Sequence, residues 1–467
     1  MGVGGVSRLV AVSNRVADFT QPTQSGGLAV GLADSLKSRG GLWFGWDGET
    51  VSSRAEIHAN VQTTGNVTTV TAPMTRKDYA EYYLGFANSV LWPLLHYRLD
   101  LVQFKPAFLE GYRRVNARFA DTLLPFLKPD DILWIHDYHL IPFASELRRR
   151  GCRQRIGFFL HIPFPPPDVL AAAPKHEWLA DSLFQYDLIG FQTQTDLGNF
   201  LRYVEEHVHA QIRSDGRIEI GNRTVVARAF PIGIDTAAFA EMARQMDEDV
   251  QIDLMRRRIL GRKQIIGVDR LDYSKGLPDR FRAFRRLLEL HPEHLKKVTF
   301  MQIAPPTRED VDAYGDIRQE LEGLSGSING GFADFNWIPI HYIHRSIPRE
   351  KLASLYRASQ VGFVTPLRDG MNLVAKEYVA AQDIDDPGVL VLSKFAGAAE
   401  ELAEALIVNP YDIDDMAENL QRALNMRVEE RRERQGALWK RVSDQDAGRW
   451  QADFLSALET PTRQEAA

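Results

Sequence analysis

Cysteine is almost missing from this sequence. Cys152 is the single cysteine among 467 residues, which excludes an internal disulfide and a zinc site built on cysteines. Long apolar runs are missing too, because the most apolar stretch, "RIGFFLHIPF", is far shorter than the ~18 residues of a membrane span. The N-terminus shows no charged region leading into a longer apolar stretch, so we expect no signal peptide. We therefore expect a cytoplasmic protein.

An excess of one charge is also missing. The chain carries 56 basic and 62 acidic residues, a formal net charge of −6. Proteins that bind nucleic acids or anionic membrane surfaces are typically basic, so we expect neither kind of partner. Small clusters of basic residues could still bind an anionic small molecule.

Short apolar runs alternate with helical patterns along nearly the whole chain. Strands that are apolar throughout, each followed by a helix, are typical of a parallel sheet covered on both faces. We expect strands at 8–14, 131–137, 155–162, 187–192, 264–270, 298–304, 337–344, 361–366, 388–394 and 405–410, and a hairpin at 216–230. Helices are expected at 28–39, 143–150 and 278–290, and one long helical stretch at 412–458. The fold class is α/β, with two Rossmann-like, doubly wound domains that face each other across a deep cleft.

Candidate ligand-binding residues of the first half follow predicted strand ends. Doubly wound sheets bind ligands there, at the carboxyl ends of their strands. Gly26 and Gly27 precede a predicted helix and could offer free N–H groups to a ligand, or form only a flexible loop. The sequence around them is not GxGxxG, so a dinucleotide fingerprint is absent. Arg15, Asp137 and His161 also lie at strand ends, and His161 could bind a hydroxyl, act as a base or ligate a metal.

The second half places two cations and two acids in similar positions. Arg270 and Lys275 follow a strand in a loop that is not a Walker loop, and together they indicate a diphosphate, unless both are solvated surface charges. Asp369 and Glu377 flank the predicted start of a helix, where backbone N–H groups favour an anion. These two carboxylates either carry chemistry or bind a ligand that has both hydroxyls and phosphate.

Eight sequence motifs, in order along the chain, resemble one known family. They are "SNR…GGL", "GGLWFGW", "EYY…VLWP.LHYRLD", "IHDYHL", "GFFLHIPFP", "RLDYSKG", "TPLRDGMNLVAKEY" and "FAGAA". Together they resemble glycosyltransferase family 20, the trehalose-6-phosphate synthases, in their compact bacterial form. Members are retaining transferases with the GT-B fold that transfer glucose from UDP-glucose to glucose 6-phosphate. The resemblance runs from about Arg8 to Trp450.

The resemblance implies a role for each matching residue on the acceptor side. The phosphate of glucose 6-phosphate would be bound by Arg15, Tyr83, Trp92 and Arg308. As isolated features, Tyr83 and Trp92 would more often be core residues and Arg308 a surface charge. Asp137 would bind the acceptor sugar and Trp46 would line its pocket.

The donor side receives its roles from the same resemblance. The implied donor residues are Gly26, Gly27, Arg270, Lys275, Ile347, Asp369, Gly370, Met371, Asn372, Leu373, Val374 and Glu377. Arg270 and Lys275 would hold the diphosphate, while Asp369 would bind the glucose hydroxyls and Glu377 the ribose hydroxyls. Ile347 would contact the uracil through its backbone. The residues implied in catalysis are Arg270, Lys275, His161 and Asp369, with His161 near the reacting centre.

Domains are expected at 1–232 for the acceptor and 233–443 for the nucleotide sugar, with a final helix at about 444–460 packed back on the first domain. The resemblance implies a homo-oligomer, a dimer or tetramer, with no metal site and no required cofactor, although Mg²⁺ could stimulate the reaction. Retention by front-face attack is expected, with double displacement left open. Other open alternatives are a different acceptor such as glycerol 3-phosphate, a GDP or ADP donor, a non-catalytic sugar-phosphate sensor, and a glycosidase using Asp369 and Glu377.

Overall fold

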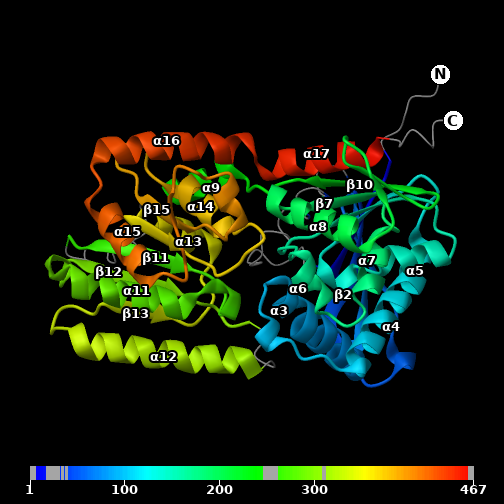
Figure 1. Cartoon of the computed structure of the whole chain (residues 1–467), viewed down its shortest axis with the longest axis horizontal. Helices are drawn as coiled ribbons and strands as arrows, with labels where there is room; N and C mark the ends of the chain where they lie inside the picture. The colour runs from blue at the N-terminus through cyan, green and yellow to red at the C-terminus, as the bar shows by residue number, and fades with distance from the viewer. Residues whose placement is uncertain are drawn as a thin grey trace. The chain divides into compact units, whose positions relative to one another are not determined.

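The computed structural model describes residues 7–16, 32, 36, 40–245, 261–307 and 312–460. By its internal contacts the chain divides into two compact units, shown together in Figure 1. Unit 1 comprises Met1–Pro231 and Trp450–Ala467, and unit 2 comprises Ile232–Arg449. Each unit is built around one sheet, with helices on its faces.

The sheet of unit 1 has ten strands in the order β3-β4-β2-β1-β5-β6-β7-β10-β9-β8. The strands are β1 (Leu9–Arg15), β2 (Gly41–Val51), β3 (Asn60–Thr64), β4 (Val67–Thr75), β5 (Ile132–His136), β6 (Arg155–Phe159), β7 (Leu188–Phe191), β8 (Gln211–Ile212), β9 (Arg217–Ile220) and β10 (Arg223–Ala229). From β4 to β10 neighbouring strands are parallel, while β3, β8 and β9 add antiparallel pairings at the edges.

The helices of unit 1 lie between these strands along the chain, except the last helix, α17, which follows the strands of unit 2. They are α2 (Arg76–Asp78), the π-helical segment η2 (Tyr79–Leu91), α3 (Trp92–Leu95), α4 (Pro106–Leu123), α5 (Phe143–Arg149), α6 (Pro167–Ala171), α7 (His176–Leu183), α8 (Gln194–His207) and α17 (Ala447–Glu459). Short 3₁₀ turns are η1 (Arg54–Glu56), η3 (Leu99–Leu101), η4 (Leu124–Phe126) and η5 (Tyr138–Leu140). The long helix α4 packs against η2 and α5, which holds the aromatic-rich η2 in place.

The last helix, α17, packs against the sheet of unit 1. Its Phe454 ring stacks on Trp134 of β5 with 4.9 Å between centroids. A Cβ added at Gly157 of β6 or at Gly190 of β7 would come within 2.8 Å of a Phe454 ring atom. Because glycine has no Cβ, these two strands leave room for the ring to lie close to the sheet.

Unit 2 contains six parallel strands in the order β13-β12-β11-β14-β15-β16. The strands are β11 (Lys263–Val268), β12 (Val298–Ile303), β13 (Ile340–Ile343), β14 (Val361–Val364), β15 (Val389–Ser393) and β16 (Leu406–Val408). In order of sequence this is 3-2-1-4-5-6, the doubly wound arrangement, and β4-β2-β1-β5-β6-β7 of unit 1 has the same order. Strand order therefore reverses between β11 and β14 in unit 2, and between β1 and β5 in unit 1.

Helices cover both faces of the unit 2 sheet. They are α9 (Thr236–Gln245), α11 (Leu277–Leu290), α12 (Asp312–Phe332), α13 (Arg349–Arg357), α14 (Leu373–Ala381), α15 (Ile413–Asn425) and α16 (Val428–Asp444), with 3₁₀ turns η7 (Tyr273–Lys275), η8 (Pro292–His294) and η9 (Gly397–Glu400). One group consists of α11, α12 and α15, and the other of α9, α13, α14 and α16. In the view of Figure 1, α12 lies below the strands of this unit and α16 above them.

The predicted strands and the hairpin are confirmed, with ends that move by a few residues. The long helical stretch predicted at 412–458 is confirmed, and it consists of three helices, because extended backbone at Met426 and Arg427 and a non-helical Gln445 interrupt it. Strands β2 to β4 were not predicted. Most of the expected helix at 28–39 lies outside the described residues, but Leu32 and Leu36 are helical and fully buried.

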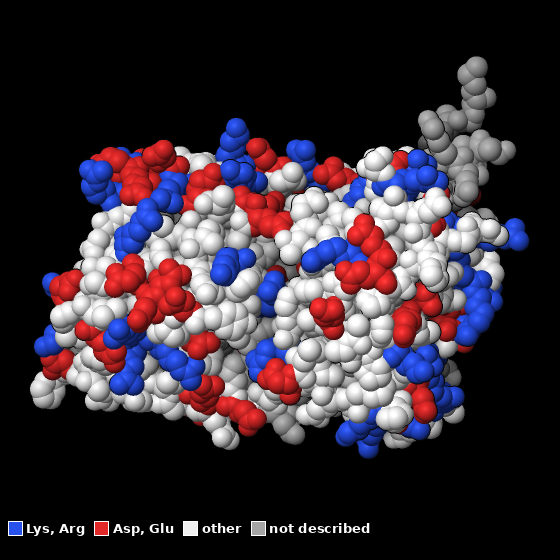
Figure 2. Space-filling model, in the orientation of Figure 1, with Lys and Arg blue, Asp and Glu red and all other residues white. Residues whose placement is uncertain are grey.

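Charges of both signs are interspersed on the face of the molecule drawn in Figure 2. This distribution agrees with the small net charge of −6. Of the helices in the described part of the chain, none combines the length and the apolar character that crossing a membrane requires.

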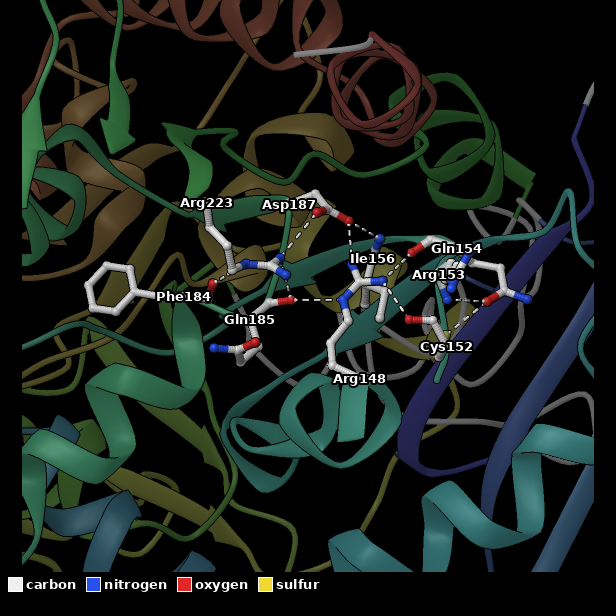
Figure 3. Close-up of polar contacts among 9 residues, drawn as sticks. All are labelled: Arg148, Cys152, Arg153, Gln154, Ile156, Phe184, Gln185, Asp187 and Arg223. Carbon is white, nitrogen blue, oxygen red and sulfur yellow. Dashed lines mark hydrogen bonds and ion pairs between the residues drawn. The ribbon is translucent and has the colours of Figure 1, made fainter. Parts of the chain in front are cut away.

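Two arginines and one carboxylate join several segments at the amino ends of β6 and β7 (Figure 3). Arg148 Nη2 donates to Asp187 Oδ2 over 2.7 Å, and the same oxygen accepts the Ile156 amide over 2.7 Å. Arg148 Nη1 also donates to the carbonyls of Cys152 and Gln154, at 3.0 and 2.8 Å. Arg223 Nη2 reaches Asp187 Oδ1 at 3.4 Å. The cluster fastens the loops that enter β6 and β7 to α5 and β10.

We expect Asp187→Asn to lower the stability of the protein, since it removes a half-buried charge that two arginines share. The loss should be about 2 kcal/mol, the usual size for hydrogen bonds to a charged group. The apparent melting temperature in differential scanning fluorimetry measures it. Glu219→Gln is the control, because Glu219 pairs with Arg213 on the surface, where ion pairs contribute little. Equal shifts for the two variants would contradict the role given to the cluster.

Candidate functional site

The reversal point of the unit 1 sheet carries two of the predicted residues. Arg15 is the last residue of β1 and Asp137 follows β5, its neighbour in the sheet. Asp137 has φ 76° and ψ 166°, a backbone conformation that a residue with a side chain rarely adopts. Its N–H donates to the Phe159 carbonyl over 2.8 Å, and its Oδ1 accepts the His161 amide over 3.3 Å. A strained residue held this firmly at a strand end is a hallmark of functional sites.

Aromatic rings connect the remaining acceptor-side residues. Trp46 and Tyr83 lie 5.6 Å apart between centroids, and Tyr83 stacks on His139 at 5.9 Å. His139 contacts Tyr138 at 3.9 Å, and Tyr138 contacts Trp92 at 5.6 Å. These five residues form a continuous aromatic row, which the η2 segment and the turn after β5 place side by side.

Arg15 lies at the Trp46 end of the aromatic row. Its guanidinium carbon is 5.8 Å from the centroid of the Trp46 ring. Gly48, with φ +98°, leaves the space for it, because a Cβ there would come within 2.6 Å of Arg15 Nη2. Unit 1 thus combines an exposed guanidinium, an aromatic row and a carboxylate, groups that suit the phosphate, the apolar face and the hydroxyls of a sugar phosphate.

His161 follows β6 and is held by a second histidine. Its Nε2 lies 3.1 Å from Nδ1 of His136, the fully buried last residue of β5, and its Nδ1 lies 3.5 Å from Gln192 Nε2. Desolvation lowers the pKa of His161 to about 3. Desolvation, and to a lesser extent His161, also lowers the pKa of His136 well below its usual range. His161 is therefore a neutral hydrogen-bonding group at physiological pH and is unsuited to carrying a proton as a cation.

The reversal point of the unit 2 sheet brings together two of the predicted catalytic residues. Lys275 Nζ lies 2.5 Å from Asp369 Oδ2, although the residues are distant in sequence. Arg270 is exposed, two residues after the end of β11. The Asp369 amide donates to the Phe395 carbonyl and the Gly397 amide to the Asp369 carbonyl, both over 3.1 Å. This pairing fixes the segment that carries Asp369 against the chain that follows β15.

Helix α14 begins directly after that segment. Gly370 and Met371 lead to Asn372, which has φ 77° and ψ 87° and accepts a hydrogen bond from the Ala375 amide over 3.3 Å. Leu373 and Val374 form the first turn, whose N–H groups have no acceptor within a helix. Such a turn carries partial positive charge and is suited to binding an anion.

Glu377 lies one turn further along α14. Its Oε1 is 3.6 Å from Arg349 Nη2. Desolvation raises the pKa of Glu377 to about 7, although Arg349 acts in the opposite direction. Ile347 is half-buried in the loop between β13 and α13, just before Pro348, the residue preceding α13.

Three predicted site residues, Gly26, Gly27 and Arg308, lie outside the described part of the chain. Sequence reasoning missed His136, Arg349, Asp269 and Arg280, which contact predicted site residues. A polar residue closing an otherwise apolar strand was a usable signal for His136. For Arg280, the signal was its position on the apolar side of its helix, beside Leu277 and Phe284.

Across 7–16, 40–245, 261–307 and 312–460 there is no group of three or more His, Cys, Asp or Glu side chains arranged to hold a metal ion.

Comparison with known proteins assigns the chain to a family. The sequence model of Glycosyltransferase family 20 matches residues 6–460. A trehalose-6-phosphate synthase of Enterobacter sp. (strain 638) is 48% identical over 458 residues, which are 98% of this chain and 96% of the relative.

Solved structures agree. An α,α-trehalose-phosphate synthase (UDP-forming) from Burkholderia xenovorans in complex with glucose-6-phosphate has a TM-score of 0.94 and 51% identity, covering 97% of this chain and 100% of that one. An E. coli structure bound with UDP-2-fluoro glucose has a TM-score of 0.93 and 47% identity, covering 98% and 100%. The GT-B fold is thereby confirmed, and this chain belongs to glycosyltransferase family 20.

Proposed function

We propose that the protein is a UDP-forming α,α-trehalose-phosphate synthase. It transfers glucose from UDP-glucose to glucose 6-phosphate with retention, giving α,α-trehalose 6-phosphate and UDP. The observation that carries the proposal is the arrangement at the start of α14, where Asp369, the first helical turn and Glu377 follow one another along the chain, with Lys275 bound to Asp369. Carboxylates at the two ends suit the hydroxyls of glucose and ribose, and the helix start between them suits the diphosphate.

Except for Arg308, the groups proposed to bind the acceptor belong to unit 1. Arg15, joined by Arg308, would hold the phosphate, with Tyr83 and Trp92 of the aromatic row beside it. Asp137 would accept hydrogen bonds from the sugar hydroxyls. Relatives with names and ligands of this kind match nearly the full length of the chain, which supports the same substrates here.

The transfer breaks the bond between the anomeric carbon of glucose and the β-phosphate oxygen. Negative charge grows on the diphosphate, and Arg270, Lys275 and the first turn of α14 would stabilise it in place. In front-face attack, the acceptor hydroxyl oxygen bonds to the anomeric carbon from the side of the leaving group. Its proton passes to a diphosphate oxygen, so no protein base is required. Neutral His161 would offer a hydrogen bond to a donor hydroxyl rather than a proton.

Several finer expectations belong to the same proposal. We propose that the backbone near Ile347 binds the uracil and that the reaction requires no cofactor but can be stimulated by Mg²⁺. We also propose that the protein assembles into a homo-oligomer and acts in the cytoplasm in osmoprotection. Size-exclusion chromatography with light scattering tests the assembly, and EDTA treatment tests the metal requirement.

One set of assays tests the function. UDP-, GDP- and ADP-glucose are each combined with glucose 6-phosphate, glycerol 3-phosphate or no acceptor, and released nucleotide and product are measured. We expect turnover with UDP-glucose and glucose 6-phosphate and retention in the product. Failure with glucose 6-phosphate would overturn the proposal. Release of free glucose without acceptor, at the rate of the full reaction, would favour a glycosidase.

We expect Asp369→Asn to lower turnover but not the affinity for UDP. Turnover should fall by about 10- to 100-fold, because the charged hydrogen bonds to glucose are lost. UDP should bind at least as tightly as to the wild type, since Lys275 no longer has a carboxylate partner that competes with the diphosphate. Isothermal titration calorimetry measures this, with Lys275→Met as the comparison that should weaken UDP binding. A loss of UDP affinity in Asp369→Asn as large as that in Lys275→Met would contradict the prediction.

The pKa of Glu377, raised to about 7, predicts a pH dependence of donor binding. Ribose hydroxyls donate hydrogen bonds most strongly to the ionised carboxylate, so the KM for UDP-glucose should fall as the pH rises from 6 to 8. Glu377→Gln should bind the donor more weakly at pH 8 and show a nearly flat profile over this range. The KM for glucose 6-phosphate is the internal control: its own phosphate titrates at about pH 6, so its profile should be the same in the wild type and Glu377→Gln. An unchanged donor profile in Glu377→Gln would exclude Glu377 as the group that titrates.

The same shift links Glu377 to stability. Its pKa in the folded protein is above the ordinary value of 4.5, so the folded state binds the proton more tightly than the unfolded state. The stabilising contribution of the neutral carboxyl group is therefore present at low pH and is lost as the pH rises towards about 7. Thermal melts at pH 5 and pH 8 should differ less for Glu377→Gln than for the wild type.

A further inference from the structure

Arg280 is a fully buried arginine in the interior of unit 2. It lies on α11 with no exposed surface, and its guanidinium donates to groups from four segments of the chain. The acceptors are Asp269 Oδ2 at 2.6 Å, the Lys275 carbonyl at 3.2 Å, Thr365 Oγ1 at 3.0 Å and Gln302 Oε1 at 3.4 Å. One side chain thus joins the loop after β11, the η7 turn, β12 and the end of β14.

Asp269 continues these contacts to the start of α14. Its Oδ2 pairs with Arg280, and its Oδ1 accepts a hydrogen bond from Asn372 Nδ2 over 3.3 Å. Asn372 Nδ2 also donates to Asp369 Oδ2 over 3.0 Å, and its Oδ1 caps the Ala375 amide over 3.3 Å. The amide of Asn372 is therefore held between two carboxylates and the helix it begins.

These contacts close into a ring of five residues. The ring runs from Asp269 to Arg280, from Arg280 to the Lys275 carbonyl, from Lys275 Nζ to Asp369, and back through Asn372 to Asp269. Two ring members, Asp269 and Arg280, have no role in the proposed binding of the donor, while the other three do. All five lie within unit 2.

Stability alone gives a weak reason for this ion pair. Removing an arginine and an aspartate from water is costly, and well-packed apolar side chains of similar volume are often as stabilising. The chain even makes room for the guanidinium, since a Cβ at Gly267 would come within 3.2 Å of Arg280 Nη1 and 2.5 Å of Gln302 Oε1. What apolar residues could not supply is a set of directed hydrogen bonds to Lys275 and Asn372.

We propose that Asp269 and Arg280 are positioning residues of the donor site. Arg280 holds the Lys275 carbonyl, and Asp269 holds the Asn372 side-chain amide. The pair thereby sets the distance between Lys275, which would bind the diphosphate, and the segment formed by Asp369 and the start of α14, which would bind the sugar and the phosphates. The proposal rests on the proposed function of Lys275, Asp369 and α14. It adds that donor binding depends on two residues that do not touch the donor.

Asp269→Asn is the main test. The amide has the same shape as the carboxylate but only one acceptor oxygen, so it can satisfy Arg280 or Asn372 but not both. We expect kcat/KM for UDP-glucose to fall by up to about 100-fold, with a raised KM, since a misplacement of about 1 Å can cost a rate factor of that size. The KM for glucose 6-phosphate should change far less, because all of the proposed acceptor residues except Arg308 lie in unit 1. A merely structural role would lower the amount of active enzyme, and so kcat, and leave both KM values alone.

Three further substitutions grade the effect and guard against misfolding. Thr365→Val removes one hydrogen bond from Arg280 and should raise the donor KM only slightly. Arg280→Lys keeps the charge but loses the planar fork, so its donor KM should lie between those of the wild type and Arg280→Gln. Asp187→Asn is the matched control: it is the same chemical change at a half-buried arginine pair, in the cluster of Figure 3. It should lower the melting temperature and leave the donor KM unchanged.

Crystal structures of the wild type and Asp269→Asn separate this inference from the proposed function. Turnover by the wild type decides the function, whereas the position of the Asn372 and Lys275 side chains can be compared whatever the substrates are. Displacement of either side chain in Asp269→Asn, with weaker UDP binding by calorimetry, supports the inference. If both stay in place, or if Asp269→Asn and Asp187→Asn change the donor KM equally, the pair is structural and the inference falls.

Discussion

The parallel pairing of β1 with β5 and of β11 with β14 is the constraint on which the rest of the structure depends. At each of these pairs the strand order reverses, so the connections that leave the two strands diverge and leave the carboxyl ends uncovered. Backbone groups and side chains that would otherwise be packed under a helix become available to a ligand. Arg15 and Asp137 lie at one of these places, and Arg270 and Asp369 at the other.

Electrostatic compensation organises the donor-side residues of unit 2. Lys275 is nearly buried, and a buried ammonium is stable only beside a carboxylate, which Asp369 supplies. Asp369 in turn accepts from Asn372, whose positive φ is stabilised by the hydrogen bond that caps α14. Each of these groups thus has a partner within the protein. Under the proposed function, donor binding would be an exchange of partners, in which a diphosphate replaces the carboxylate at Lys275.

Unit 1 uses desolvation and aromatic contacts instead of ion pairs around its predicted residues. His136 and His161 share a hydrogen bond and are both held neutral, and the row from Trp46 to Trp92 is built from ring contacts. Arg15 remains exposed at the end of the row. A largely buried aromatic row with one exposed guanidinium and one carboxylate, Asp137, suits the proposed acceptor, a sugar whose single charged group is a phosphate.

Much of the fold could be predicted from the sequence because its strands are short, apolar throughout and separated by helices. The missed strands β3 and β4 are different, since β3 is exposed along its whole length and β4 is buried at only some of its positions. Strand β2 has a continuous buried run at 42–46, so its signal was present in the sequence and was overlooked. The break between α15 and α16 was also missed, because a charged sequence with good helix formers does not reveal that Met426 and Arg427 become extended. The site residues at strand ends were predictable for a simple reason: position in a doubly wound sheet selects them.

By itself, the sequence determined the α/β class, the family through its ordered motifs, and the residue types that a nucleotide sugar and a sugar phosphate require. Only the tertiary structure decided which of these residues touch one another. Parallel strand pairing and helix packing set three contacts: Lys275 with Asp369, His161 with His136, and Arg280 with Asp269. The pKa values of His161 and Glu377 were decided there too, because desolvation depends on every segment packed around a group and not on its neighbours in the chain.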